Sequence, residues 1–218
     1  MNGTASQATT GMTSKQKRDL RRLQNDALDE AGLGKDRAQK LYGKGGIYKA
    51  GIKKLIAELT ASDLLESVGT VNLSAIASFV AADRFRDDRK GEVVIGWIGD
   101  NFRRNFLGKT ETDVPATQLH VYKLVKSSVD GPIIAELGEE MSETTLGQMF
   151  EMMKAQGHGE DGTLLTNGCA NIFYIRDDRG TVWAVYCGWF SVDGCWRVEA
   201  GPVADPDGWV AGGQVVSR

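Results

Sequence analysis

The alternation of apolar and turn-forming residues is clearest in the last fifty residues of the chain. Branched and aromatic residues cluster there in three runs, at 172–175, 181–189 and 195–200. Asp177-Asp178-Arg179-Gly180 and Asp193-Gly194 separate these runs, and such clusters are typical of tight turns between strands. We therefore predict an antiparallel β-meander, followed by a last edge strand at 214–216 that ends in an exposed Ser217-Arg218.

The middle strand of this meander is apolar on both faces. Because successive side chains of a strand point to opposite faces, the chain sorts into two sets: Trp183, Val185, Cys187 and Trp189 on one face, and Val182, Ala184 and Tyr186 on the other. Trp196, Val198 and Ala200 likewise share one face of the next strand. We expect the middle strand to be central and covered on both sides, on one side by a helix that carries Phe150.

Helical spacing dominates the first third of the chain. Thr13 and Gln16 have capping-box spacing, and the apolar residues that follow recur at helical intervals until Gly32 and Gly34. Further helices are predicted around 36–42 and 48–59, and Ser62 is expected to cap one more turn through Leu65.

The middle of the chain is mixed. Residues 73–85 fit a short helix or a strand, and both readings stay open. Strands are predicted at 92–98 and 119–125, and Phe102 and Phe106 are predicted to lie on one helical turn. We interpret Asp130-Gly131-Pro132 as a turn.

A helix is predicted from Ser142, its cap, to about Gln156. Its buried stripe consists of Leu146, Met149, Phe150 and Met153, and Glu143 and Glu151 are expected to face water.

The pattern as a whole predicts an α+β protein: a small N-terminal helical region, then a mixed region and a C-terminal antiparallel β-meander packed on a helix. We divide the chain into a disordered tail at 1–12, a basic helical region at 13–70, and an α+β domain at 71–218.

Composition bounds the class of protein. The chain has 218 residues, of which 41% are hydrophobic and 25% charged, enough for a real core. No stretch approaches 18 apolar residues, and residues 1–13 lack the apolar centre of a secretory signal, so we expect no membrane association and no export. Three cysteines, Cys169, Cys187 and Cys195, form an odd set that favours free thiols and a cytoplasmic location. A hairpin that turns at Asp193-Gly194 would not place Cys187 opposite Cys195.

Charge is distributed unevenly along the chain. Residues 11–60 contain twelve basic and six acidic residues, although the net charge of the whole chain is −3. A basic segment of this kind indicates either a solvated helical face or a surface for a polyanion. The candidate nucleic-acid contacts are Lys15, Arg18, Arg21, Arg22, Lys49 and Lys53.

Catalytic and metal-binding patterns are weak. The chain has two histidines, His120 and His158, and only His158 lies near a cysteine in sequence, Cys169. The pairs Glu160-Asp161 and Asp177-Asp178 are better explained as turn residues than as metal ligands. We therefore predict no catalytic residue, no cofactor and no metal, and we lean against an enzyme.

Exposed tryptophans are the other candidate. Trp189 and Trp209 lie near turns and could contact a protein partner, whereas Trp183 and Trp196 are expected in the core.

Several blocks of residues have a familiar order: 98–104 (IGDNFRR), 128–138 (SVDGPIIAELG), 143–146 (ETTL), 159–162 (GEDG), 171–177 (NIFYIRD) and 215–218 (VVSR). Over residues 79–218 the chain resembles a family of hypothetical proteins from candidate-phylum bacteria with small genomes. The resemblance implies that the second half of the chain is one unit, and it implies no activity.

Taken together, the sequence predicts a non-enzymatic cytoplasmic interaction or structural module of unknown partner and unknown oligomeric state. The alternative is a nucleic-acid-associated protein that binds through its basic N-terminal helices.

Overall fold

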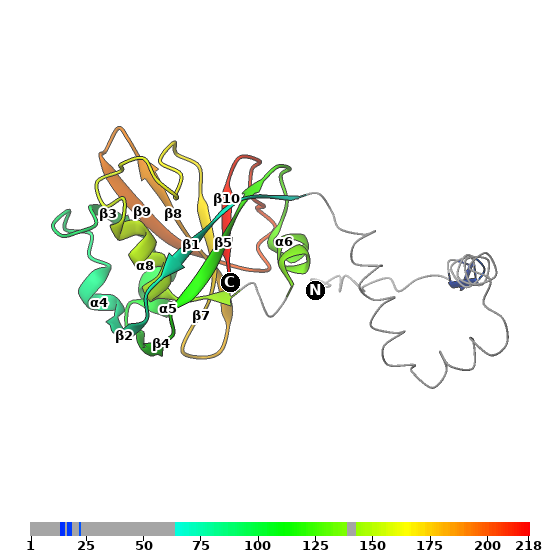
Figure 1. The fold of residues 1–218 in the computed structure, drawn as a ribbon, viewed down its shortest axis with the longest axis horizontal. Coiled ribbons are helices and arrows are strands. Elements are labelled where there is room, and N and C mark those ends of the chain that lie inside the picture. Colours follow the sequence, from blue (N-terminus) through cyan, green and yellow to red (C-terminus); the bar gives the residue numbers. More distant parts are fainter. Residues whose placement is uncertain (1–13, 16, 19–21, 23–63, 139–142) are drawn as a thin grey trace, which may run out of the picture. The chain divides into compact units, whose positions relative to one another are not determined.

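The computed structural model describes residues 14, 15, 17, 18, 22, 64–138 and 143–218 (Figure 1). The chain divides into two units, Met1–Thr60 and Ala61–Arg218, which we consider separately. The described residues of the first unit are helical and exposed: Ser14, Lys15, Lys17, Arg18 and Arg22. In the described part of the chain, no helix combines the length and the apolar character that a membrane crossing requires.

One large sheet organises the second unit. Its strands are β1 (Leu65–Leu73), β3 (Ile95–Ile98), β5 (Thr117–Leu124), β6 (Glu143–Thr144), β7 (Asn171–Arg176), β8 (Val182–Phe190), β9 (Cys195–Pro202) and β10 (Gln214–Ser217). They follow the order β1-β5-β10-β7-β8-β9-β3, and β6 pairs with β7. Most neighbours are antiparallel, whereas β10–β7, β6–β7 and β3–β9 are parallel. The described fold is therefore mixed α/β with a large, mostly antiparallel sheet.

A second, two-stranded ribbon continues the edge of this sheet. It consists of β2 (Ile76–Val80) and β4 (Thr110–Val114), which pair antiparallel. The pairing of β1 with β5 ends at Leu73 and Thr117, and the pairing of β2 with β4 begins at Ile76 and Val114. Only a few residues on each strand separate the two ladders, and Phe79 of β2 lies in the larger core cluster.

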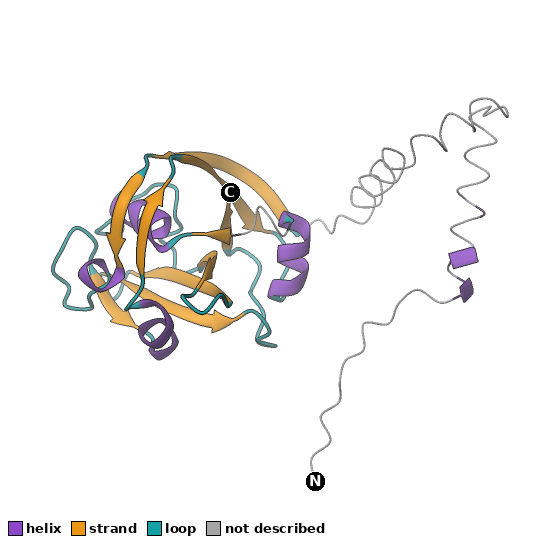
Figure 2. Ribbon diagram, turned by 90° about the horizontal axis from the view of Figure 1, so that it is seen from below, coloured by secondary structure: helices purple, strands orange, loops and turns teal. Residues whose placement is uncertain are grey.

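Four helices pack on the sheet: α4 (Ala81–Arg84), α5 (Asp100–Phe106), α6 (Asp130–Leu137) and α8 (Leu146–Lys154). The larger core cluster contains residues of α4, α5 and α8 together with one face of β5, β7, β8 and β9. The smaller cluster contains Ile133 of α6 and the opposite sheet face, including Ile172, Tyr174 and Val215. The sheet thus has an inner face under α8 and an outer face under α6 (Figures 1 and 2).

The predicted meander is confirmed. β7, β8 and β9 are consecutive antiparallel neighbours, and α8 packs on their inner face. Val185 and Cys187 of β8 lie in the larger cluster and Ala184 in the smaller one, as the alternation predicted. Cys187 pairs with Val198, so it does not lie opposite Cys195. Phe102 and Phe106 are buried on α5, also as predicted.

The last strand differs from its prediction. We expected an edge strand, but β10 lies in the middle of the sheet, antiparallel to β5 and parallel to β7. Ser217 is buried rather than exposed. The physical reason is that Val215 and Val216 point to opposite faces and both faces are covered, which a central position requires.

Three further expectations are wrong at the level of single elements. Leu65 begins the strand β1 rather than ending a helical turn. Asp130 begins α6 instead of a turn. The helix expected from Ser142 begins at Leu146 and ends at Lys154, while Glu143 belongs to β6.

Other expectations gain an answer or stay untested. Residues 73–85, left open between helix and strand, contain β2 followed by the single turn of α4. The predicted helices at 36–42 and 48–59, the Thr13 and Ser62 caps and the tail at 1–12 lie outside the described residues.

Candidate functional site

The outer face of the sheet is covered over only part of its width. α6 and the segment around Trp209 cover the outer face over β5, β10, β7 and part of β8. Beyond them, the outer side of β8, β9 and β3 carries large side chains that neither core cluster contains. Trp97 on β3 is 45% exposed and Phe190 on β8 is 38% exposed. Large apolar side chains that gather on an uncovered sheet face are typical of interaction surfaces.

A shallow depression of about 200 Å³ lies between these side chains. Its lining residues come from β3, β8, β9 and the segment before β7: Trp97, Gly168, Ala170, Tyr186, Gly188, Phe190, Arg197 and Glu199. Glycine and alanine form much of the floor, so the aromatic rings stand above it as walls. We name the surface formed by Trp97, Tyr186, Phe190 and Trp209 the aromatic face.

Arg197 lies on this face in contact with an aromatic ring. Its guanidinium carbon is 4.0 Å from the centroid of the Phe190 ring, within the range of a cation–π interaction. The same guanidinium donates a hydrogen bond to the carboxylate of Asp193, at the tip of the β8–β9 hairpin. The positive charge of Arg197 is therefore paired with a carboxylate of the same chain.

Glu199 contributes a carboxylate to the same depression. One of its oxygens, Oε1, accepts a hydrogen bond from the backbone N–H of Ala200 at 2.8 Å. The other, Oε2, lies where a side chain at Gly99 would stand, 1.9 Å from an ideal Cβ. The glycine that follows β3 thus makes room for the Glu199 carboxylate beside Trp97.

A second hollow of about 320 Å³ adjoins the depression and shares Tyr186 with it. Asp130, Asp205, Asp207 and Trp209 line it, and we name it the acidic cleft. The rings of Tyr186 and Trp209 meet edge to face, with centroids 5.0 Å apart. These two rings connect the aromatic face with the acidic cleft.

Asp130 fixes one wall of the acidic cleft. Its Oδ1 accepts hydrogen bonds from the Tyr174 hydroxyl at 2.8 Å and from the Trp209 indole N–H at 2.7 Å. Burial raises the pKa of Asp130, hydrogen bonds from Trp209 and Tyr174 oppose that rise, and the carboxylate of Asp205 adds to it. Burial beside Asp130 likewise raises the pKa of Tyr174. These groups hold α6, β7 and Trp209 together.

The potential around Tyr186 is negative. Burial raises the pKa of the Tyr186 hydroxyl, and the nearby carboxylates of Glu199 and Asp205 raise it further. The hydroxyl therefore remains protonated at neutral pH and can donate a hydrogen bond into the site. Among the lining residues of the two hollows, the carboxylates of Glu199, Asp205 and Asp207 outweigh the single guanidinium of Arg197.

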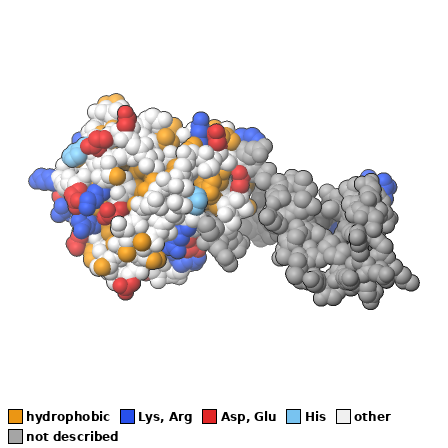
Figure 3. Space-filling model, in the orientation of Figure 1, with side chains coloured by type: hydrophobic (Ala, Val, Ile, Leu, Met, Phe, Trp, Pro, Cys, Tyr) orange, Lys and Arg blue, Asp and Glu red, His pale blue; other side chains and the backbone are white. Residues whose placement is uncertain are grey.

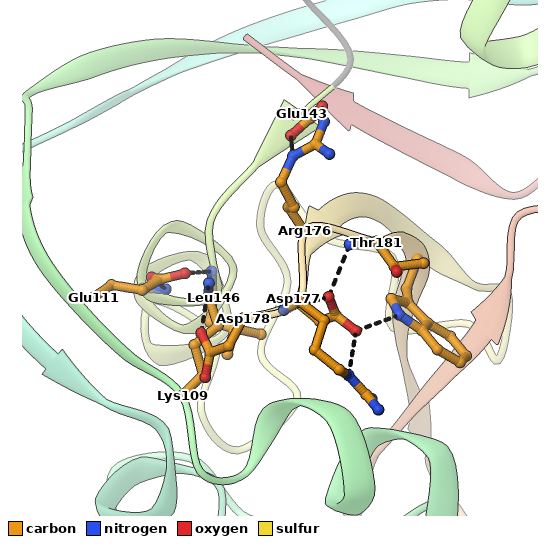
Figure 4. Close-up of polar contacts among 11 residues, drawn as sticks. Lys109, Glu111, Glu143, Leu146, Arg176, Asp177, Asp178 and Thr181 are labelled. Atoms are coloured by element: carbon orange, nitrogen blue, oxygen red, sulfur yellow. Dashed lines mark hydrogen bonds and ion pairs between the residues drawn. The ribbon is translucent and has the colours of Figure 1, made fainter.

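Another polar cluster, drawn in Figure 4, stabilises the fold instead. Asp177 accepts hydrogen bonds from the backbone N–H groups of Arg179 and Thr181 and from the Trp183 indole. Burial raises the pKa of Asp177, but the donors from Thr181, Trp183 and Arg179 outweigh it, so the pKa is lowered. Because all of these donors belong to the fold itself, the Asp177 carboxylate stabilises its turn.

The start of α8 is closed in the same way. The two oxygens of Glu111 accept hydrogen bonds from the backbone N–H groups of Leu146 and Gly147 (Figure 4). In addition, Thr145 forms a capping box with Gln148. The Arg176–Glu143 and Lys109–Asp178 ion pairs lie nearby. The N-terminal amides of α8 thus have internal partners.

Another hollow, of about 720 Å³, lies elsewhere, between β1, β5 and the segment 162–169. It is lined mainly by glycine and small polar residues, together with Lys123 and Cys169.

Among the described residues, no group of three or more His, Cys, Asp or Glu side chains is placed to hold a metal ion. On the face shown in Figure 3, charged side chains of both signs intermix at one end and hydrophobic ones are scattered. The aromatic face carries the more specific chemistry.

The predicted tryptophans differ in how deeply the structure buries them. Trp209 lines the acidic cleft, half-buried, as part of the site. Trp189 was predicted to be exposed, but it is only 9% exposed and its ring packs against Trp196 and beside Gly159. Trp196 is buried as predicted, and Trp183 is partly buried against the core.

The basic candidates belong to the first unit. Lys15, Arg18 and Arg22 are helical and exposed, with spacing that places them on one helix face. Arg21, Lys49 and Lys53 lie outside the described residues.

His158 and Cys169, the histidine–cysteine candidate, each form a hydrogen bond with another residue. His158 is exposed in the loop after α8, where its backbone N–H donates to Glu160, and the backbone N–H of Cys169 donates to Asn167. No hydrogen bond joins His158 to Cys169 within the described residues. The aspartates of 177–178 act as turn and ion-pair residues.

Trp97 and Phe190 are the site residues that the sequence did not reveal. Phe190 continues the alternation that puts Tyr186 on the outer face, so its orientation could have been read from the strand pattern. Trp97 could not, because the register between β3 and β9 shifts between Ile95 and Trp97. A shift of this kind breaks the simple two-residue period.

In comparisons with known proteins, no family model, curated protein or solved structure matches this chain. The resemblance over residues 79–218 to hypothetical proteins of candidate-phylum bacteria stays a prediction.

Proposed function

We propose that the chain is a non-enzymatic interaction module that binds a protein partner through the aromatic face. The observation that carries this proposal is the exposure of Trp97 and Phe190 on the same uncovered part of the sheet. Tryptophan, tyrosine and phenylalanine bury large areas at little cost in side-chain entropy, and they are enriched at protein interfaces.

The surroundings of these rings support a protein partner. Glu199 and Asp207 would repel the phosphates of a nucleic acid, so the aromatic face does not suit base stacking along a charged backbone. Arg197 beside Phe190 adds a residue type that is enriched at binding hot spots.

We place the module in the cytoplasm. None of the cysteines forms a disulfide, and burial raises the pKa of the Cys187 thiol, which favours a reduced and inert state. Epitope-tagged protein, followed by cell fractionation, tests this location.

Site-specific crosslinking tests the proposed surface. A photoreactive phenylalanine analogue replaces Phe190 in one protein and Val68 of β1 in a control protein, since Val68 is also exposed. After irradiation in an extract of the native organism, we expect a discrete protein adduct from position 190 that resists nuclease. Trp97→Ala in the same chain should abolish it. Equal adducts from both positions, or adducts of nucleic acid only, contradict the proposal.

The second candidate is nucleic-acid association through the first unit. It is favoured by Lys15, Arg18 and Arg22, which are exposed and helical. If this surface binds a polyanion, affinity for duplex or single-stranded DNA should fall steeply with salt and be lost in the variant Lys15/Arg18/Arg21/Arg22→Ala. Absent or salt-independent binding excludes this alternative.

A further inference from the structure

We propose that the aromatic face receives a cationic side chain, arginine or lysine, from an extended segment of the partner protein, with the cation beside Trp97 and Tyr186 and the acidic cleft holding a second cation. This inference rests on the proposed function and names the chemistry of the partner.

The balance of charge is the first argument. Arg197 is the only cation among the residues that line the two hollows, and Asp193 pairs with it. Within the described residues, no ion pair involves Glu199, Asp205 or Asp207. A carboxylate beside an aromatic ring favours a cation over a neutral or anionic group.

The second argument comes from the rings themselves. The face already accommodates one guanidinium, because Arg197 stacks on Phe190 with its charge paired at Asp193. The rings of Trp97 and Tyr186 line the same depression beside Glu199. Trp97, of the ring type that binds cations best, thus lines a hollow of about 200 Å³ together with a carboxylate that has no ion-pair partner among the described residues.

The adjacency of the two hollows, which share Tyr186, favours an extended segment over a single small cation. They share Tyr186 and together line the outer side of β8 and β9 towards the segment around Trp209. Side chains of an extended peptide that point to one face recur every second residue, about 7 Å apart. Glu199 and Asp205 both lie close enough to Tyr186 to act on its hydroxyl, so a peptide with alternating cations can offer one cation to each hollow.

The indole N–H groups supply site-specific reporters for the test. Those of Trp183 and Trp196 donate to Asp177 and to the Gln156 carbonyl inside the fold, whereas that of Trp209 borders the acidic cleft and Trp97 lines the depression. The full chain, labelled with ¹⁵N, is titrated with the peptide acetyl-Gly-Arg-Gly-Arg-Gly-Arg-Gly-amide and with its citrulline, lysine and glutamate counterparts.

We expect the arginine peptide to shift the Trp97 and Trp209 indole signals and to leave Trp183 and Trp196 unmoved. The lysine peptide should do the same. Citrulline has the shape of arginine without its charge, so the citrulline peptide should bind at least about tenfold more weakly than the arginine peptide. Raising salt from about 0.05 to 0.5 M should weaken the arginine complex, because exposed charges are screened.

Two variants sharpen the result. Gly188→Ala adds a methyl group at ordinary contact distance, 3.6 Å from the Phe190 ring, so it fills the floor of the depression without a clash. Gly108→Ala is the matched control, since an added Cβ there meets nothing within 4 Å. We expect Gly188→Ala, and separately Asp205→Asn with Asp207→Asn, to weaken the arginine peptide about fivefold or more. Gly108→Ala should leave its affinity unchanged.

Several outcomes overturn the proposal. They are equal binding of arginine and citrulline peptides, tighter binding of the glutamate peptide, shifts of all indole signals alike, and no shift at all. Binding of a neutral oligosaccharide such as maltohexaose at Trp97, with none of the arginine peptide, assigns the face to sugars instead. A nuclease-resistant protein adduct at position 190, together with failure of all cationic peptides, retains the proposed function and rejects only the cationic partner.

Discussion

The start of α8 gives the most quantitative prediction of the fold. Glu111 reaches from β4 to the first two backbone N–H groups of the helix, at 3.0 and 2.8 Å, and is only 8% exposed. Glu111→Gln keeps one oxygen acceptor but turns an NH₂ group toward the other N–H. Because helix N-termini leave such amides without intrahelical partners, one of them becomes buried and unpaired.

The cost follows from those two contacts. An unsatisfied buried donor costs about 1–3 kcal/mol, and replacing a charged acceptor by a neutral one weakens the other bond by about 1 kcal/mol. We therefore expect Glu111→Gln to lower the free energy of unfolding by about 2–4 kcal/mol.

Urea denaturation followed by tryptophan fluorescence measures this loss, with the slope of the transition as a check on the two-state assumption. Glu66→Gln, on the exposed strand β1, is the control and should change stability by less than about 0.5 kcal/mol. A loss below about 1 kcal/mol for Glu111→Gln, with an unchanged slope, refutes the reasoning that this carboxylate closes the helix.

Three smaller predictions follow from other contacts. Thr145→Ala removes the capping box of α8 and should cost about 1 kcal/mol in the same assay. The pKa of Asp130 is raised in the folded state, so the stability that its protonated form provides is present in acid and is lost as pH rises through that pKa. Asp130→Asn cannot ionise; its unfolding free energy relative to the parent should therefore improve from about pH 4 to pH 7, and a pH-independent difference contradicts this assignment. Cys187 is fully buried with a raised pKa, so a thiol reagent followed by mass spectrometry should label half-exposed Cys169 first and Cys187 only after unfolding.

Local pattern was sufficient for the meander but not for the whole sheet. β7, β8 and β9 are neighbours in sequence, and tight turns fix their pairing, so the strand pattern predicted them. The position of β10 depends on pairing with β5, which lies about ninety residues earlier, and no local signal encodes that contact. The central place of β10 was nevertheless indicated by Val215 and Val216, because two adjacent apolar residues need cover on both faces.

The misread elements have local physical causes. β1 has a mostly exposed, polar sequence at the edge of the sheet and therefore lacks clear alternation. Pro132 stands in the first turn of α6, where a backbone N–H has no intrahelical acceptor, so proline is tolerated there. The residues that we interpreted as a turn therefore begin a helix. At α8, Thr145 with Gln148 forms the actual capping box, three residues after the serine that we predicted as the cap.

The candidate site was only partly visible in the sequence. Trp209 was found because it follows a turn cluster, and Tyr186 was placed on the outer face by the alternation of β8. The prediction that Trp189 is exposed was wrong, because a position near a turn does not determine burial. The loop that contains Gly159 packs on the Trp189 ring. Trp97 was missed because the register shift between β3 and β9 breaks the two-residue period that would have placed its side chain.

The most direct test of the account is the solvent exposure of each indole in the isolated protein. Paramagnetic relaxation by a soluble, uncharged gadolinium chelate, read from the five tryptophan side-chain N–H signals, measures it. We predict that Trp97 relaxes most strongly, that Trp209 is intermediate, and that Trp196 is protected. Relaxation of Trp97 as weak as that of Trp196 would mean that the aromatic face is covered and cannot serve as a binding surface.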